Sequence, residues 1–305
     1  MKSFWVIALV VLFPFLATSA QNSAGGGRAH APKSLLIVAH PDDEYELAGT
    51  VYRIATELGD VVDQVIITDG EGGFRYSSLA ARYYGVNLTN EQIDRANLPR
   101  IREQEARQAA KVLGIRHQWF LGEHDDHFTV NVKEALAMWN IPKVSAELDA
   151  TLRNGRYDFV FVLLPTADDH GEHKAATLLA LKAVEALPQA DRPTVIAAQA
   201  SPKTDLKYTS LESYPITATT TATPVFDFDR DAHFGFHNAL SYQIVVDWVI
   251  AEHKSQGLFQ TKAGQDRFES FWLFSTNSAV NVSRAEKLFH EIPLTAEHVS
   301  AEVAR

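Results

Sequence analysis

The feature that most constrains this fold is a series of short, mainly apolar runs separated by amphipathic stretches. The runs occupy residues 34–39, 61–68, 118–121, 159–164 and 194–198. Short runs with little polar alternation are typical of strands that are covered on both faces, and such strands occur mainly in parallel sheets. The sequence therefore predicts an α/β, Rossmann-like layered fold with a mostly parallel sheet.

Helical periodicity fills the intervals between these runs. Apolar residues recur every three or four positions over residues 44–58, 98–113, 144–152 and 172–187. After residue 200 the expected elements are a hairpin or edge strands at 216–223 and 225–228, a helix at 238–253 and a strand at 268–274. Because no internal repeat and no linker divides the chain, we expect a single domain over residues 33–305 with a C-terminal elaboration.

The composition limits the partners and the chemistry of the chain. Its 305 residues include 28 Lys and Arg against 38 Asp and Glu, which gives a formal net charge of −10. A negatively charged surface repels polyanions, so neither nucleic acid nor an anionic bilayer is expected as the main partner. The chain has no cysteine, which excludes disulfides, thiolate metal sites and thiol nucleophiles. Any protein-bound metal must be held by imidazole and carboxylate groups.

The N-terminal residues have the pattern of a secretory signal. Lys2 provides a positive start, residues 4–16 are almost entirely apolar, and small residues at 17–20 precede a polar segment. We therefore predict a signal peptide over residues 1–20 and a flexible lead-in over 21–32, with a secreted or periplasmic location for the mature protein. An uncleaved membrane anchor is the alternative, although the apolar stretch is shorter than the roughly 18 residues that a spanning helix needs.

The first cluster of reactive residues stands at the end of the first predicted strand. His40, Asp42 and Asp43 follow Ala39 in the run Ala-His-Pro-Asp-Asp-Glu, and open α/β sheets bind ligands beyond the carboxyl ends of their strands. His40 and Asp43 lie three residues apart across a turn fixed by Pro41, so both can ligate one divalent ion. Asp42 can then take a proton from metal-activated water. The alternative, that the aspartates only cap a helix, leaves His40 unexplained.

A second cluster follows the fourth predicted strand. Residues 168–173 are Asp-Asp-His-Gly-Glu-His, so His170 and His173 stand one helical turn apart. One of them can complete the metal ligands while the other serves as proton donor or oxyanion partner. Two such histidines alone are typical of polar surface. The matching positions of the two clusters at strand ends favour one shared site.

These residues give the chain a resemblance to the PIG-L/LmbE de-N-acetylases, a family of zinc-dependent hydrolases that includes N-acetylglucosaminyl-phosphatidylinositol deacetylase. The family's first signature is intact at residues 39–44. Its second signature, commonly His-Pro-Asp-His, is His-Gly-Glu-His at residues 170–173. Further similarity lies in Arg-Glu-Gln-Glu-Ala at 102–106, Phe-Leu-Gly at 120–122 and His-Lys-Ser-Gln at 253–256.

The resemblance implies a metal-dependent hydrolase that removes the N-acetyl group from an N-acetylated amino sugar or its glycoconjugate. It implies that His40, Asp43 and His173 hold Zn²⁺, with Asp42 as the general base and His170 as the acid that protonates the departing amine. Two imidazoles and a carboxylate also accept Fe²⁺. The alternatives are the same chemistry on a non-sugar acylamide, and a non-catalytic carbohydrate-binding protein with this fold.

The resemblance also implies two substrate contacts. Arg102 stands in the context of the family's substrate-binding arginine, with a salt bridge to Glu105 one turn later on the helix as the alternative. Asp125 lies in the turn at 124–127, His-Asp-Asp-His, which also looks like a second metal cluster but is similar to a family turn whose aspartate contacts substrate.

One departure from the family concerns the oxyanion. Some members carry a tyrosine two residues before the histidine acid, where this chain has Asp168. An anion cannot stabilise an oxyanion, so we expect Asp168 or Asp169 to orient His170 instead.

Overall fold

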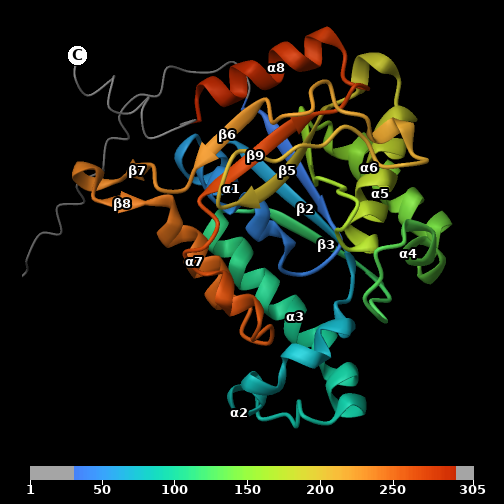
Figure 1. The fold of residues 1–305 in the computed structure, drawn as a ribbon, viewed down its shortest axis with the longest axis vertical. Helices are drawn as coiled ribbons and strands as arrows, with labels where there is room; N and C mark the ends of the chain where they lie inside the picture. The colour runs from blue at the N-terminus through green and yellow to red at the C-terminus, as the bar shows by residue number, and fades with distance from the viewer. Residues whose placement is uncertain (1–30, 293–305) are drawn as a thin grey trace, which may run out of the picture. The chain divides into compact units, whose positions relative to one another are not determined.

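The computed structural model describes residues 31–292, and a seven-stranded sheet runs through this part of the chain (Figure 1). The strand order is β3-β2-β1-β4-β5-β9-β6. The strands are β1 (Lys33–Val38), β2 (Val61–Thr68), β3 (His117–Glu123), β4 (Phe159–Leu163), β5 (Thr194–Ser201), β6 (Phe226–Asp229) and β9 (Phe268–Leu273). The first five are parallel to one another, whereas β9 is antiparallel to its neighbours β5 and β6. The predicted α/β fold with a mostly parallel sheet is confirmed.

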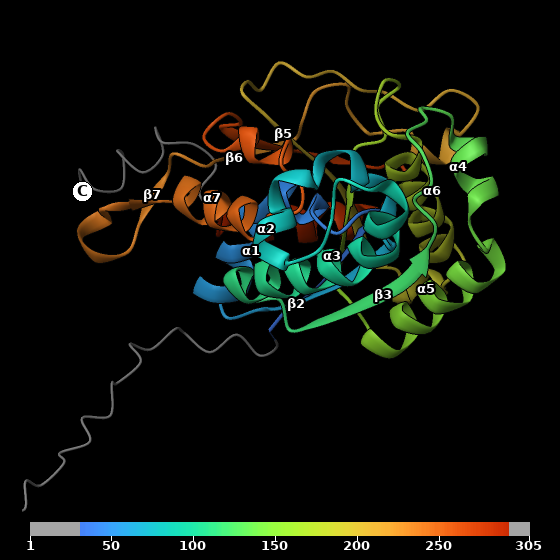
Figure 2. The same cartoon turned by 90° about the horizontal axis from the view of Figure 1, so that it is seen from below.

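Helices cover both faces of this sheet (Figures 1 and 2). One face packs against α1 (Ala48–Tyr52), α3 (Glu91–Leu113), α7 (Tyr242–Glu252) and α8 (Ala279–His290), and the other against α4 (Val132–Met138), α5 (Ile141–Gly155) and α6 (Gly171–Glu185). In β1, Leu36 belongs to the first core, and Leu35 and Ile37 belong to the second. Each side chain is buried on one face or the other, which explains why the runs show little polar alternation.

The longest helix begins and ends at clear local signals. The Asn90 side chain accepts a hydrogen bond from the Ile93 amide at 3.0 Å, and Gly114 closes α3 in the left-handed conformation. The predicted helix at 98–113 therefore begins earlier, at Glu91. A short helix, α2 (Ala81–Tyr84), lies in the connection that leads to it.

The chain after residue 200 only partly follows the prediction. β6 is an edge strand, as expected for 225–228, and β9 and α7 match the late strand and helix. Residues 216–223 form no regular strand, and the predicted edge pairing is reduced to an isolated antiparallel bridge between Thr219 and Phe274. The threonine hydroxyls of this segment bond to nearby carbonyls, as Thr221 Oγ1 does to Thr223 O at 2.8 Å, and such bonds compete with a strand ladder. The sequence patterns do not predict α8 or the short hairpin of β7 (His233–Phe234) and β8 (Leu240–Ser241).

The strand order places two loops side by side. β1 pairs with β2 on one side and with β4 on the other, so the chain reverses its direction of winding at this point. Open α/β sheets bind their ligands at such a switch point, beyond the carboxyl ends of the strands. Residues 39–44 follow β1 and residues 164–173 follow β4, so both predicted clusters meet there.

The described residues can be searched for a membrane-spanning helix, but they do not include the predicted signal peptide. Within residues 31–292, no helix is both long enough and apolar enough to cross a bilayer. The predicted signal peptide at 1–20, and residues 21–30 of the predicted lead-in, lie outside the described part of the chain. Export therefore stays a prediction.

Candidate active site

The turn after β1 orients Asp43 through main-chain hydrogen bonds. The amides of Ala39 and His40 donate to Asp43 Oδ2 at 3.0 and 2.7 Å, which leaves Oδ1 available for another partner. A 3₁₀ segment, Asp43–Leu47, follows directly and leads into α1. The helix predicted at 44–58 thus begins as a tighter turn that holds the first cluster at the strand end.

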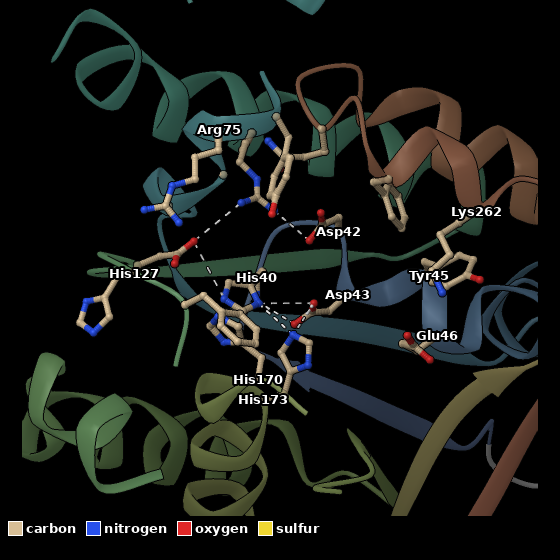
Figure 3. Close-up of a pocket in the computed structure, with 18 of the residues that line it drawn as sticks. His40, Asp42, Asp43, Tyr45, Glu46, Arg75, His127, His170, His173 and Lys262 are labelled. Atoms are coloured by element: carbon tan, nitrogen blue, oxygen red, sulfur yellow. Dashed lines mark hydrogen bonds and ion pairs between the residues drawn. The ribbon is translucent and has the colours of Figure 1, made fainter. Parts of the chain in front are cut away.

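Three side-chain atoms converge in front of this turn. His40 Nδ1 lies 3.0 Å from His173 Nε2 and 3.6 Å from Asp43 Oδ1, and His173 Nε2 lies 3.1 Å from the same oxygen (Figure 3). Ligand atoms held ~2.0–2.1 Å from a tetrahedral zinc stand about 3.3 Å apart. The three separations fit the edges of one coordination tetrahedron, so the structure brings the predicted ligand set together.

Carboxylates hold the far nitrogen of both predicted imidazole ligands. Glu172 Oε2 lies 2.6 Å from His40 Nε2, and Asp169 Oδ1 lies 3.0 Å from His173 Nδ1. Such carboxylate partners fix the tautomer and the orientation of metal-binding histidines. His40, His170 and Glu172 form another group with ligand atoms close together. The 2.6 Å contact within that group has the length of a hydrogen bond rather than of ligand spacing.

Both carboxylate partners differ from the sequence-based expectations. No role is expected for Glu172 from the sequence, and Asp168 or Asp169 is expected to orient His170. In the structure Asp168 is exposed, and the Asp169 side chain contacts the His173 ring and the main-chain amide of His170. Both acids are close in sequence to the predicted ligand His173, and this proximity is the signal in the sequence that could have identified them. Only Asp169 pairs with His173, whereas Glu172 pairs with His40 from the other cluster.

Burial and charge oppose each other in this cluster. Burial lowers the pKa of His40, but Asp43 and Glu172 outweigh it and raise that pKa to about 10. Burial also favours the neutral form of Asp43, yet His173 and His40 hold its pKa well below the usual range. The pKa of His173 is raised well above its usual value by Asp43 and Asp169, despite burial. The cluster therefore attracts positive charge, as protons or as a cation.

Asp42 lies beside the cluster and is paired with Arg102. Arg102 Nη2 is 2.8 Å from Asp42 Oδ1, and Nη1 donates to the Gly70 carbonyl at 2.9 Å. The guanidinium is almost completely buried. The salt bridge considered for Arg102 and Glu105 is not formed, because the Glu105 carboxylate accepts hydrogen bonds from the Ser255 amide and hydroxyl instead. Arg102 thus orients Asp42.

His170 stands at the start of α6, edge-on to His40 with ring centres 4.8 Å apart. Its Nδ1 accepts a hydrogen bond from the Glu172 amide at 3.4 Å, so the hydrogen of the neutral ring sits on Nε2. Burial and the neighbouring imidazoles of His40 and His173 lower the pKa of His170 to about 2. The ring is suited to donate a hydrogen bond from Nε2.

Asp125 reaches the same place from the end of β3. Its Oδ2 lies 3.9 Å from Arg102 Nη1 and 4.0 Å from His40 Nε2. The approach depends on Gly72, where a Cβ would stand 2.3 Å from Asp125 Oδ1. Only glycine leaves room for this packing. The structure therefore joins Asp125 to the predicted site.

The two histidines of the same turn do not form a cluster with each other. His124 is 74% exposed, and its Nδ1 lies 3.2 Å from Glu71 Oε1. His127 Nε2 lies 3.0 Å from Glu134 Oε1 instead. Because the two histidines turn to different partners, they share no ligand group with each other within the described residues. His124 instead lies with Asp69 and Glu71 in a largely exposed group of possible ligands.

The seven site residues singled out from the sequence line one cavity of about 290 Å³. Figure 3 shows Arg75 and His127 on one side of the central imidazoles, and Tyr45, Glu46 and Lys262 on the other. Besides the seven residues singled out from the sequence, the lining comprises Tyr45, Glu46, Gly72, Gly73, Arg75, Tyr76, Asp126, His127, Phe128, Gln256, Phe259 and Lys262. The cavity therefore extends on both sides of the candidate metal centre.

Comparison with known families agrees with this geometry. The family model described as PIG-L, GlcNAc-PI de-N-acetylase, matches residues 35–184. The chain carries a PIG-L family domain. The matched span runs from β1 to the end of α6 and contains all seven of the residues singled out from the sequence. The family resemblance inferred from the sequence is confirmed.

The proteins to which this chain is similar are named for different reactions. A Bacillus cereus protein named "Probable N-acetyl-alpha-D-glucosaminyl L-malate deacetylase 2" is 26% identical over 163 residues, which are 53% of this chain and 66% of the relative. Among solved structures, the N,N'-diacetylchitobiose deacetylase of Pyrococcus horikoshii is 19% identical with a TM-score of 0.51, covering 80% of this chain and 84% of its own. The 4-carboxy-2-hydroxymuconate hydratase of Pseudomonas putida is 16% identical with a TM-score of 0.52, covering 81% and 98%. These structures show the fold, and the fold alone does not determine the reaction.

One departure of this PIG-L domain from the common second signature has a structural reason. Gly171 stands where the signature commonly has proline. Its amide donates a hydrogen bond to the Thr129 carbonyl at 2.6 Å, which proline cannot do. A Cβ at this position would lie 2.9 Å from the Asn131 carbonyl oxygen and 3.0 Å from that of Thr129. Glycine therefore lets the chain after β3 pack against the start of α6.

Proposed function

We propose that this protein is a metal-dependent N-deacetylase that removes the acetyl group from an N-acetylated amino sugar or its glycoconjugate. The observation that carries the proposal is the convergence of His40, Asp43 and His173 beside the carboxylate of Asp42. The position at the switch point of the sheet supports it, as do the PIG-L family domain and the deacetylase name of the Bacillus relative.

We propose Zn²⁺ as the cofactor, held by His40, Asp43 and His173. Two imidazoles and one carboxylate suit zinc, and three protein ligands leave a coordination position open for chemistry. When bound, zinc polarises a carbonyl group and lowers the pKa of water towards about 7. The same donor set accepts Fe²⁺, so metal analysis after aerobic and anaerobic purification distinguishes the two.

Asp42 is the proposed general base. Arg102 holds its Oδ1, which leaves Oδ2 to accept a proton from the attacking water. The same proton can pass to the nitrogen as the C–N bond breaks, so that the leaving group is an amine rather than an amide anion. The products are acetate and a free amino sugar.

His170 and two further residues are proposed to act on the substrate. His170 Nε2 donates a hydrogen bond to the acetyl oxygen as negative charge develops on it. Protonation of the amine by His170, which the family resemblance implies, requires an imidazolium and stays a prediction. Asp125 is proposed to accept a hydrogen bond from a sugar hydroxyl, and Arg102 to support that contact from 3.9 Å away.

Two alternatives share the fold and part of the site. A non-sugar acylamide would use the same metal ligands and base, so only a substrate panel separates it from an amino sugar. A non-catalytic carbohydrate-binding protein has no use for a carboxylate, Asp42, that is held beside the ligand cluster by a buried arginine. The presence of Asp42 at this place therefore favours an enzyme over a carbohydrate-binding protein.

The decisive experiment is acetate release by the zinc-loaded protein from a panel of N-acetylated saccharides, peptides and amino acids. We expect release from saccharides, and we expect Asp42→Asn to keep about one zinc per chain while losing about 10²–10⁴-fold in rate. Asp149→Asn, on the exposed side of α5, is the control and should behave as the wild type. Full turnover by Asp42→Asn would remove Asp42 as the base. Release of another acyl group in place of acetate would replace deacetylation as the function.

We also propose that the mature protein is exported, on the pattern of residues 1–20. The expected mature N-terminus is Gln21, after cleavage that follows Ala20. Mass spectrometry of the protein from the extracytoplasmic fraction measures it. An intact Met1 in protein confined to the cytoplasm would contradict export.

A further inference from the structure

One side of the cavity is not used by the proposed reaction. Tyr45, Glu46 and Lys262 line it, beyond Asp43 as seen from the central imidazoles (Figure 3), and Phe259 lines the cavity beside Tyr45. The Tyr45 hydroxyl donates to Asp266 and is therefore occupied. Lys262 Nζ lies 3.3 Å from the same carboxylate. The remaining polar group of this side is Glu46.

Glu46 presents one fixed oxygen and one open oxygen. Its Oε2 accepts a hydrogen bond at 2.6 Å from the amide of Ala200, near the carboxyl end of β5. Its Oε1 has no hydrogen-bond partner among residues 31–292, and the residue lines the cavity. The tether to β5 holds the carboxylate in place, so the open acceptor is preorganised for a donor that enters the cavity.

The surroundings of Glu46 solvate its charge poorly. Burial raises the pKa of Glu46 to about 7, against the opposing effects of the Ala200 amide and Arg230. A carboxylate with an unmet acceptor in such a place gains more from a hydrogen-bond donor than an exposed carboxylate does. A ligand hydroxyl is a donor of this kind, and it needs no countercharge.

An aromatic ring stands on the same side. Phe259 lines the cavity and packs edge-on against Tyr45, with ring centres 5.3 Å apart at 90°. A fixed aromatic surface beside a fixed acceptor suits a sugar ring, which offers C–H groups on its face and hydroxyl donors at its rim. These observations come from residues outside the ligand set and outside the proposed base.

We propose that this side of the cavity is a second sugar subsite, in which Glu46 Oε1 accepts a hydrogen bond from a hydroxyl group of a neutral sugar residue joined to the N-acetylated one. Phe259 forms the apolar wall of the subsite. The inference rests on the proposed function, because the candidate metal centre must hold the acetyl-bearing residue. It makes Glu46 a determinant of substrate length.

Glu46→Gln tests the subsite without removing its tether. The amide oxygen can still accept from Ala200, so the NH₂ group then faces the cavity and replaces the acceptor by a donor. Glu123→Gln is the control for removing charge from a tethered carboxylate outside the cavity. Glu123 Oε2 also accepts a main-chain amide, that of Asn140, at 2.6 Å, while its Oε1 lies 2.9 Å from Lys143 Nζ, and Glu123 does not line the cavity.

Two measurements are compared for each protein. The first is the kcat and KM of the zinc-loaded enzyme on N-acetylglucosamine and on N,N'-diacetylchitobiose. The second is calorimetric binding of the disaccharide to the metal-free protein, which does not depend on catalysis. For Glu46→Gln we expect KM and Kd for the disaccharide to rise about tenfold, with kcat and the monosaccharide KM unchanged. Glu123→Gln should match the wild type in every value.

The outcomes separate the subsite from the reaction. If no saccharide releases acetate but Glu46→Gln still weakens disaccharide binding, the subsite stands and the deacetylase proposal fails. If acetate is released and Glu46→Gln behaves as the wild type, the subsite is wrong. Equal losses in Glu46→Gln and Glu123→Gln would also overturn it, because they would show only the loss of a structural tether.

Tighter binding of fully deacetylated chitobiose than of the diacetyl form would show recognition of an ammonium group instead of a hydroxyl. Absence of disaccharide binding to the metal-free wild type, together with a KM of the zinc-loaded wild type that is no lower for the disaccharide than for the monosaccharide, would overturn the subsite outright.

Discussion

Two regions of this protein place histidines next to acids in the sequence, yet only one encloses its possible metal ligands. In the switch-point cluster, residues 40–43 and 169–173, loops from two adjacent strands bring the buried His40 imidazole and the half-buried His173 imidazole to within 3.0 Å of each other. In the β3 turn, residues 124–127, His124 also meets acids from a neighbouring strand end, Asp69 and Glu71, but its side chain is 74% exposed. The difference teaches that enclosure of the converging groups, rather than local composition, distinguishes the candidate metal centre.

Loss of a ligand from the switch-point cluster should have the largest effect. His40→Ala removes one vertex of the tetrahedron and the partner of Glu172, so zinc should be lost and acetate release should fall by about 10³-fold or more. Metal analysis and the acetate assay measure both. A His40→Ala protein that retains one zinc per chain would refute the ligand assignment.

Replacement of an acid partner sharpens the comparison between the two regions. Glu172→Gln weakens the orientation of His40 while keeping the ligand, so zinc affinity should fall about 10–100-fold. Glu134→Gln makes the same change beside His127 in the β3 turn and should leave zinc affinity unchanged. Competition with a chelator gives both affinities. Equal effects of the two variants would remove the distinction drawn here.

Zinc binding at the switch-point cluster should depend on pH. His40 must be neutral to ligate the metal, and its pKa in the metal-free protein is raised to about 10, so near neutral pH zinc has to displace a proton. The affinity should therefore rise with pH, by up to about tenfold per pH unit for each displaced proton. Calorimetry in buffers of different ionisation enthalpy counts the protons. An affinity that is constant between about pH 6 and 8 would contradict the linkage.

The smallest effect is expected in the β3 turn. His124→Ala removes an exposed side chain whose contact is with Glu71. The free energy of unfolding should change by no more than about 0.5 kcal/mol, and the zinc content should stay the same. Thermal unfolding and metal analysis check both values. Loss of zinc from this variant would show that the turn takes part in metal binding after all.

The elements that position the site were predictable because their signals are local. The apolar runs that become β1 and β4 are buried on both faces, so they differ clearly from amphipathic helices. The residues that follow them were predictable as ligands because strand ends at a switch point gather side chains. The resemblance of residues 39–44 to the family signature then assigned the roles of metal ligand and general base to these residues.

The contacts among side chains were not predictable in the same way. Arg102 could pair along its own helix or across to another loop, and only the packing against Asp42 decides between them. The pairing of His40 with Glu172 depends on the register between β1 and β4, which no single segment encodes, whereas Asp169 lies only four residues before its partner His173. The threonines at 216–223 have strand propensity, yet their hydroxyls bond locally instead.

The antiparallel strand β9 has a consequence for the order of assembly. Among residues 31–292, β6 pairs with β9 alone. β9 is made about forty residues later in the chain, and it lies between β5 and β6 in the sheet. During synthesis the ribosome therefore releases all the residues of the candidate metal centre, which end at His173, while one edge of β5 still lacks its neighbour. A growing chain in this state exposes unpaired amides and carbonyls to other chains. Synthesis of β9 near the C-terminal end of the described residues thus completes the sheet and covers the open edge of β5.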